Sequence, residues 1–187
     1  MFETETLVNH FLIAMPNLGD PNFFRTVTFV CEHGIEGAMG IVINRPIDLT
    51  FREVFSQLGI EADSCARLDD HVYLGGPVQS NRGFVLHEPL GAWESTLAVS
   101  PTLGVSTSRD ILAAIARNEG PSHCLLALGY AGWGPGQLEK EMAENAWLSG
   151  PANPEILFRT PTDARWASAA HLLGVDLANL SGESGHA

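Results

Sequence analysis

Residues 122–130 read SHCLLALGY, and every side chain from Cys124 to Leu128 is apolar. A strand with one face in water alternates apolar and polar residues, whereas a strand covered on both faces is apolar throughout. We therefore predict that Ser122–Tyr130 is a central strand of a sheet. The glycine-rich segment GYAGWGPG, residues 129–136, leads from it into a predicted helix at Pro135–Ala146, with Pro135 at the first helical position.

Outward from this strand, short runs of β-branched and aromatic residues are separated by turn residues, which is typical of strands. Six further strands are predicted, at His10–Met15, Arg25–His33, Glu36–Asn44, His71–Leu74, Arg82–His87 and Thr96–Val99. Gly34 lies between the strands Arg25–His33 and Glu36–Asn44, so a hairpin is the natural connection between them.

Helices are predicted from their end signals. Thr50 and Glu53 have the spacing of a capping box, and Gly59 suits the left-handed residue after a helix. Two more helices are predicted, at Ser108–Asn118 and Asp163–Leu173. Because consecutive hairpins and strand–helix alternation both occur, the order predicts an α+β fold with a mixed, mainly antiparallel sheet and about four surrounding helices. A parallel doubly wound sheet is the alternative.

Size and composition are those of an ordinary compact domain. The 187 residues are 45% hydrophobic and 17% charged, without a repeat, a low-complexity tract or a linker that divides the chain. We therefore expect a single domain over residues 1–187, with a tail that frays from Leu180.

The charge balance disfavours two classes of partner. The chain has 10 basic and 22 acidic residues, a net charge of −12, and its basic residues form no run. Affinity for nucleic acid comes largely from cations that neutralise phosphates, so this balance opposes binding to nucleic acid and to an anionic membrane. A protein partner or a small ligand is the expected partner, and the sequence does not indicate an oligomeric state.

The sequence also indicates the cellular compartment of the protein. Met1–His10 contains none of the Lys or Arg residues that begin a secretory signal, and no apolar stretch approaches the roughly 20 residues of a membrane helix. Cys31, Cys65 and Cys124 are widely spaced and form no CxxC motif, which indicates reduced thiols in the cytoplasm. The seven histidines are dispersed, so we expect no metal and no cofactor.

Cys31 and His33 are the first candidate functional residues. Positions i and i+2 of a strand project to the same face, and an imidazolium beside a thiol lowers its pKa and produces a reactive thiolate. The alternative is a buried structural cysteine near a surface histidine, which the frequent burial of free cysteine favours.

The glycine segment is the second candidate. A strand, a glycine loop and a helix start can together hold an anion with backbone N–H groups, here at Gly132, Gly134 and Gly136. The Lys and Ser/Thr of a P-loop are absent, and the spacing is not GxGxxG. Tight packing of the backbone around Tyr130 and Trp133 is the favoured interpretation.

The remaining candidates are polar residues in or beside apolar strands. Arg25, Asn44 and Arg82 either find structural partners or line a polar pocket, and both interpretations stay open. His87 and Glu88 could converge with Cys31 and His33 by folding, but a metal site there is disfavoured.

Four stretches resemble the YqgE/AlgH family of bacterial proteins. The first comprises HFLIAMP (residues 10–16), CEH (31–33) and GAMGIVIN (37–44). The second comprises GGPV (75–78) and RGFVLH (82–87). The third comprises LGYAGW (128–133), GQLE (136–139) and NAWL (145–148), and the fourth LFRTP (157–161), RW (165–166) and LGVD (173–176).

The resemblance implies a cytosolic bacterial α+β protein whose sheet has a barrel-like core, in a largely uncharacterised family. One branch carries a name that links it to transcriptional control, although no helix-turn-helix is predicted here because strands separate the helices. Because no complete catalytic set is present, a non-enzymatic regulatory or binding protein is the favoured hypothesis. A direct transcription regulator and a thiol-dependent enzyme or redox sensor using Cys31 with His33 are the alternatives.

Overall fold

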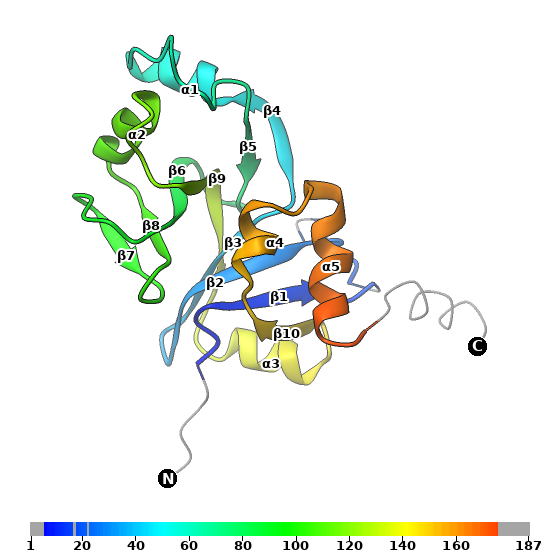
Figure 1. The fold of residues 1–187 in the computed structure, drawn as a ribbon. Helices are drawn as coiled ribbons and strands as arrows, with labels where there is room; N and C mark the ends of the chain where they lie inside the picture. The colour runs from blue at the N-terminus through cyan, green and yellow to red at the C-terminus, as the bar shows by residue number, and fades with distance from the viewer. Residues whose placement is uncertain (1–5, 17, 22, 176–187) are drawn as a thin grey trace.

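Ten strands form one curled sheet in the computed structural model, which describes residues 6–16, 18–21 and 23–175 (Figure 1). The strand order is β10-β1-β2-β3-β9-β6-β8-β7, and β5 joins β4 to β9 beside this path. The strands are β1 (His10–Ala14), β2 (Val27–Gly34), β3 (Gly37–Val42), β4 (Pro46–Thr50), β5 (His71–Leu74), β6 (Val78–Glu88), β7 (Thr96–Ala98), β8 (Gly104–Ser106), β9 (His123–Trp133) and β10 (Trp147–Pro151). The tail from Leu180 lies outside the described residues.

Strand β9 connects the two halves of this sheet. Its first part pairs antiparallel with β6 and parallel with β5, where Tyr73 lies opposite Ala127. Its last part pairs with β3, where Gly40 lies opposite Ala131. Because neighbours and helices cover both faces, Leu125, Leu126 and Ala127 are all buried. The predicted central strand is confirmed, and it continues beyond Tyr130 to Trp133.

Glycines allow the connection from β5 to β6 to cross β9 in backbone contact. The Gly75 N–H donates to the Leu128 carbonyl at 2.7 Å. A Cβ atom on Gly76 would lie 2.1 Å from the Tyr130 carbonyl carbon, and one on Gly129 would lie 2.4 Å from the Gly76 oxygen. Atoms of a side chain cannot approach backbone so closely, so these positions require glycine.

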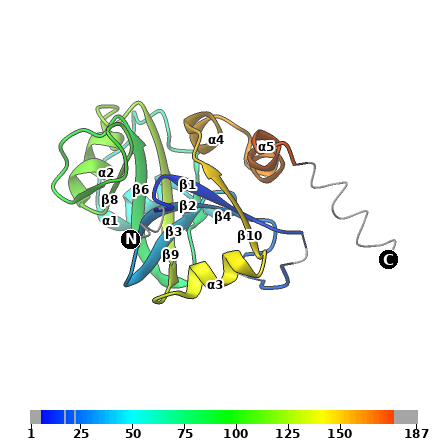
Figure 2. The same ribbon diagram turned by 90° about the horizontal axis from the view of Figure 1, so that it is seen from below.

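Five α-helices occur in the described residues: α1 (Phe51–Leu58), α2 (Arg109–Ala116), α3 (Gln137–Ala143), α4 (Pro154–Phe158) and α5 (Arg165–Leu172). Helices α1 and α2 lie together at one end of the molecule (Figure 1), where Phe55 and Ile115 share a core cluster with Leu126. Helix α3 lies on the side of the sheet opposite α4 and α5 (Figure 2), and its Leu138 packs in a cluster with Val30 and Trp133. The largest cluster joins α4 and α5 to strands from β1 to β9.

The α+β class and the mainly antiparallel sheet are confirmed, and β5 with β9 is the parallel pair among the described strands. The sheet curls into a half-barrel, which agrees with the barrel-like core that the family resemblance implies. Strands β4, β8 and β10 and helix α4 were not predicted from the sequence. Helix α4 carries recognisable signals, since the Asn153 side chain accepts from the Glu155 and Ile156 N–H groups and Pro154 begins the helix.

The predicted start of the first helix at Thr50 is confirmed without its capping box, and the predicted start at Pro135 is wrong. Thr50 precedes α1, but its side chain makes no capping hydrogen bond and instead donates to Glu53 Oε1 at 3.4 Å. Pro135 lies outside α3, because Gly136 in the left-handed region is the residue that precedes this helix. Gly59 does end α1 in the left-handed conformation, as predicted.

Replacing Gly76 with Ala tests the crossing. The added Cβ meets fixed backbone of Tyr130, so we expect Gly76→Ala to lower the free energy of unfolding by about 3 kcal/mol or more. The matched control is Gly59→Ala, because Gly59 has a φ of 67° but an added Cβ there would have no atom within 4 Å. That control is expected to cost about 1 kcal/mol. Urea unfolding of both variants gives the comparison, and equal losses would contradict the steric explanation.

Candidate functional site

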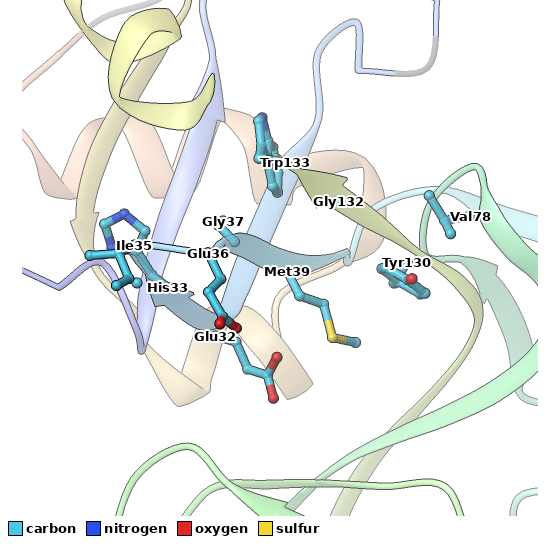
Figure 3. A pocket seen from close by; sticks show the side chains of 12 residues that line it. Glu32, His33, Ile35, Glu36, Gly37, Met39, Val78, Tyr130, Gly132 and Trp133 are labelled. Atoms are coloured by element: carbon cyan, nitrogen blue, oxygen red, sulfur yellow. The ribbon is translucent and has the colours of Figure 1, made fainter. Parts of the chain in front are cut away.

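An open groove of about 760 Å³ lies where the β2–β3 hairpin meets the end of β9 and the start of β6. Figure 3 shows the side chains that line it. We call it the hairpin groove, and the residues that define it are Glu32, Glu36, Met39, Val78, Tyr130 and Gly132. It brings together segments that lie far apart in the sequence.

A short turn fixes the hairpin against β9. Gly34 pairs with Gly37, which leaves Ile35 and Glu36 as the two residues of the turn. Gly37 has a φ of 130°, and a Cβ atom there would lie 2.1 Å from the Trp133 carbonyl oxygen. Glycine at this position therefore lets the turn rest directly on the end of β9.

The floor of the groove is apolar and partly uncovered. Met39 lies opposite Gly132 in the β3–β9 pair, and Val78 lies opposite Tyr130 in the β6–β9 pair. A Cβ atom on Gly132 would meet only the Tyr130 ring at 3.5 Å and the Val78 side chain at 3.9 Å, which are ordinary contacts. Val78 is 36% exposed, and Ile35 at the rim is 95% exposed. Exposed apolar side chains beside a depression are typical of a binding surface.

The charge of the groove is acidic at the hairpin end. Glu32 and Glu36 extend to the side of the hairpin that carries Met39, as Figure 3 shows, and no Arg or Lys of the described chain lines the groove. A second depression of about 260 Å³ shares Met39 and Tyr130 with it and contains Arg82, whose Cζ lies 5.6 Å from the centre of the Phe84 ring. The combined surface therefore runs from two carboxylates, across apolar side chains, to one guanidinium.

His33 anchors the hairpin from its other side. The Leu7 N–H donates to His33 Nδ1 at 3.0 Å, so the ring proton is on Nε2 and is donated to Glu139 Oε1 at 2.5 Å. This hydrogen bond keeps the pKa of the Glu139 carboxyl below its ordinary value. The His33 side chain is only 4% exposed, so the ring supports the groove and does not enter it.

The structure separates Cys31 from His33. A β-bulge between Val30 and Glu32 interrupts the alternation of β2, so the prediction that both side chains share a face is wrong. Cys31 lies in the main core cluster with Phe29, whereas His33 contacts Glu139 of α3. Burial raises the pKa of the Cys31 thiol far above its ordinary value, and Glu32 adds to the rise. The predicted thiol–imidazole pair is therefore not formed.

Asn44 is hydrogen-bonded to the backbone on both sides of Thr26, at Arg25 and Val27. Asn44 Nδ2 donates to the Arg25 carbonyl at 2.9 Å, and Asn44 Oδ1 accepts from the Val27 N–H at 2.9 Å. The Arg25 guanidinium lies over the Trp166 ring at 5.2 Å. The sequence left open whether these residues have structural partners or line a polar pocket. The contacts give both Arg25 and Asn44 a structural partner.

His87 is fully buried and has partners for both ring nitrogens. Nδ1 donates to the Pro89 carbonyl at 3.0 Å, and Nε2 accepts from the Ser106 hydroxyl at 2.7 Å. Burial lowers the pKa of His87, and the hydrogen bond to Pro89 opposes this in part. In the described part of the chain, no three His, Cys, Asp or Glu side chains are grouped so that they could hold a metal ion.

The glycines of the predicted anion-binding loop take part in other contacts. Gly132 forms the floor of the hairpin groove, and the Gly134 N–H donates to the Gln137 side chain at 3.0 Å. Gln137 also donates to Glu141 at 2.9 Å, so polar side chains occupy the start of α3. The favoured interpretation from the sequence, tight backbone packing, does not hold at these glycines, because an added Cβ would meet only ordinary contacts at Gly132 and Gly134 and nothing within 4 Å at Gly136. Over the described residues, no helix has the length and apolar character needed to span a membrane.

Alkylation rates test the thiols. Burial raises the pKa of Cys124 to about 11 from its ordinary 9.0, so we expect its thiolate fraction at neutral pH to fall about a hundredfold. Fully buried Cys31 is expected to react more slowly still. Native and urea-unfolded chains are treated with iodoacetamide, and each cysteine is followed by peptide mass spectrometry. Reaction of Cys31 in the native chain at the unfolded rate would contradict its burial.

Comparisons with known proteins place the chain in a family. The AlgH-like family model matches residues 11–178. A UPF0301 protein of Thioalkalivibrio sulfidiphilus is 58% identical over all of both chains, and one of Nitrosococcus oceani is 58% identical over 96% of each. The solution structure of the AlgH protein from Pseudomonas aeruginosa has a TM-score of 0.79 at 49% identity, covering 97% of each chain. A Corynebacterium diphtheriae protein, 22% identical, shares the fold with a TM-score of 0.70 over 91% of this chain and 89% of its own. The resemblance seen in the sequence is confirmed, and the chain belongs to the AlgH-like family.

Proposed function

We propose that this chain is a non-enzymatic binding protein of the cytoplasm that holds a positively charged segment of a partner protein in the hairpin groove. The observation that carries the proposal is the pairing of exposed apolar side chains with two carboxylates in a groove that no described Arg or Lys lines. The partner segment presents a Lys or Arg to Glu32 and Glu36 and an apolar side chain to Met39 and Tyr130.

Energetics support a protein segment as the occupant. Covering Ile35 and Val78 removes apolar surface from water, which contributes roughly 25 cal/mol for each Å² buried. The carboxylates of Glu32 and Glu36 add selectivity for a cationic side chain, and the net charge of −12 attracts such a segment at long range. Arg82 at the far end favours an acidic residue there and fixes the direction of the segment.

The alternatives have weaker support. A direct contact with DNA requires cations on a surface, whereas the charge balance and the hairpin groove are both acidic. We therefore propose that any regulatory effect passes through a protein partner. A thiol-dependent activity of Cys31 with His33 has no support, because the two side chains lie on different faces and the thiol is buried.

Site-directed cross-linking in the host tests the groove. A photoreactive amino acid replaces Ile35 at the rim, and the control replaces Leu172 of α5, which is 54% exposed. We expect a discrete cross-linked protein from position 35 and none of the same mass from position 172. Mass spectrometry identifies the partner and the attached peptide, which should contain Lys or Arg beside an apolar residue.

Two variants then block the groove without changing the core. Gly132→Val fills the floor where a Cβ has only ordinary contacts, and Glu32→Lys with Glu36→Lys reverses the charge. Each change is expected to reduce the position-35 adduct about tenfold or more, with the melting temperature changed little. An adduct that survives both changes would contradict binding in the groove. So would an equal adduct from position 172.

A further inference from the structure

A separate cavity, of about 310 Å³, lies on the other half of β9, away from the hairpin groove and from the depression that contains Arg82. It is bounded by β5, the start of β9, and the segment that joins α4 to α5. We call it the Arg165 cavity, and the lining residues that matter here are Tyr73, Cys124, Leu157, Phe158, Thr162 and Arg165. It shares no residue with the hairpin groove.

Arg165 is a buried cation without a carboxylate partner. The residue is 5% exposed, and within the described ranges it forms no ion pair. Its Nε donates to the Thr160 carbonyl at 3.0 Å, and its Nη1 donates to the Ile43 carbonyl. Buried charges are normally paired, because taking an ion out of water costs several kcal/mol. Two neutral carbonyls orient this guanidinium but do not neutralise it.

The rest of the guanidinium faces groups that suit an anion. Its Cζ lies 5.1 Å from the centre of the Tyr73 ring, and its Nη2 makes no hydrogen bond to any described residue. The Tyr73 hydroxyl is 2.8 Å from the Thr162 hydroxyl, and Thr162 is only half-buried. One of these two hydroxyls donates to the other, which leaves one hydroxyl proton to donate to an oxyanion beside the cation.

Other charges at the cavity are already paired or neutral. Asp70 lies 3.5 Å from Arg67, and Asp69 lies 3.2 Å from Arg52 at the rim. The thiol of Cys124 stays protonated, because burial raises its pKa to about 11. His71 Nδ1 is 3.2 Å from the Ile47 carbonyl. Among the described lining residues, Arg67 and Arg165 balance Asp69 and Asp70 in formal charge, so Arg165 offers a ligand its unbonded Nη2 rather than a net positive charge.

We propose that the Arg165 cavity binds a small organic anion. Its carboxylate or phosphate head lies against Arg165 and the Tyr73 and Thr162 hydroxyls, and its apolar body lies against Leu157 and Phe158. Guanidinium groups bind either head by paired hydrogen bonds. The volume is at the lower end of the range for small-molecule sites, which limits the ligand to roughly ten to fifteen non-hydrogen atoms.

Titration of the full-length, isotope-labelled chain tests the proposal by NMR. Benzoate is the carboxylate probe, phenyl phosphate is the phosphate probe, and benzyl alcohol is the neutral control of similar shape. We expect at least one anion to shift the Arg165 Nε–H and Thr162 signals saturably, with a dissociation constant of about 1 mM or lower. The anion that binds more tightly identifies the head group. No saturable shift with either anion, or equal binding of benzyl alcohol, would overturn the proposal.

Substitutions locate the site. Arg165→Met should weaken binding about tenfold or more, while Arg159→Met, an exposed arginine paired with Glu155, should leave it unchanged. Because Arg165 also holds two backbone carbonyls, its variant is checked by its amide spectrum. Thr162→Val provides the second test, since it removes a hydroxyl and keeps the shape, and we expect binding to weaken about threefold to tenfold. Unchanged affinity in Thr162→Val together with a folded, fully binding Arg165→Met would overturn the assignment.

Discussion

The contact on which the rest of the structure depends is the backbone crossing of Gly75 and Gly76 over β9. Gly129, with a φ of 78°, lies on the other side of this contact and also leaves no room for a side chain. Because the crossing is this close, β9 can pair with β5 before Gly129, with β3 after it, and with β6 on both sides of it. One strand thereby belongs to both halves of a curled sheet. Each half then needs its own helices to cover it.

Both cavities follow from that arrangement. The hairpin groove uses Tyr130, Gly132 and Trp133 at the end of β9, and the Arg165 cavity uses residues 124–126 near its start. At the first, the β2–β3 hairpin rests on β9 through Gly37 but leaves Gly132 uncovered. At the second, the chain between α4 and α5 covers β5 and β9 incompletely. The hairpin groove has two carboxylates and no described Arg or Lys, whereas the Arg165 cavity has Arg67 and Arg165 beside Asp69 and Asp70, so the two suit different ligands.

The sequence predicts the elements whose signals are local. The apolar run before Tyr130 indicates a central strand, and Gly59 marks a helix end, because burial on two faces and a left-handed φ each leave a trace in neighbouring residues. Strands β8 and β10 were missed because they are short and contain Gly, Ser or Pro. Their pairing with distant strands stabilises them, and propensity does not register such pairing. The Asn153–Pro154 pair, in contrast, is a local signal from which α4 was predictable.

The candidate sites were harder to predict because they depend on distant neighbours. A single extra residue in β2 moves Cys31 into the core and His33 to the other face, and no local pattern near residue 31 indicates this bulge. Glu32 and Glu36 look like ordinary solvated residues until β9 and Val78 are placed beside them. Ile35, an apolar residue in a turn between glycines, is the local sign of an exposed apolar surface. The burial of Arg165 depends on the Ile43 and Thr160 carbonyls, one of which is far away in the chain.

Burial closes one pair of potentially reactive side chains to any substrate. Ser106 and His87 have the separation of a nucleophile and its base, at 2.7 Å, but both are 0% exposed. The Ser106 hydroxyl also lies 2.7 Å from the Thr96 hydroxyl, so this pair belongs to a closed hydrogen-bond network between β6, β7 and β8. A catalytic nucleophile must reach its substrate, whereas a buried network of this kind fixes the register of neighbouring strands. Neither Ser106 nor His87 lines the hairpin groove or the Arg165 cavity, so the binding proposed at both sites rests on other groups: carboxylates, apolar side chains and the Arg165 guanidinium.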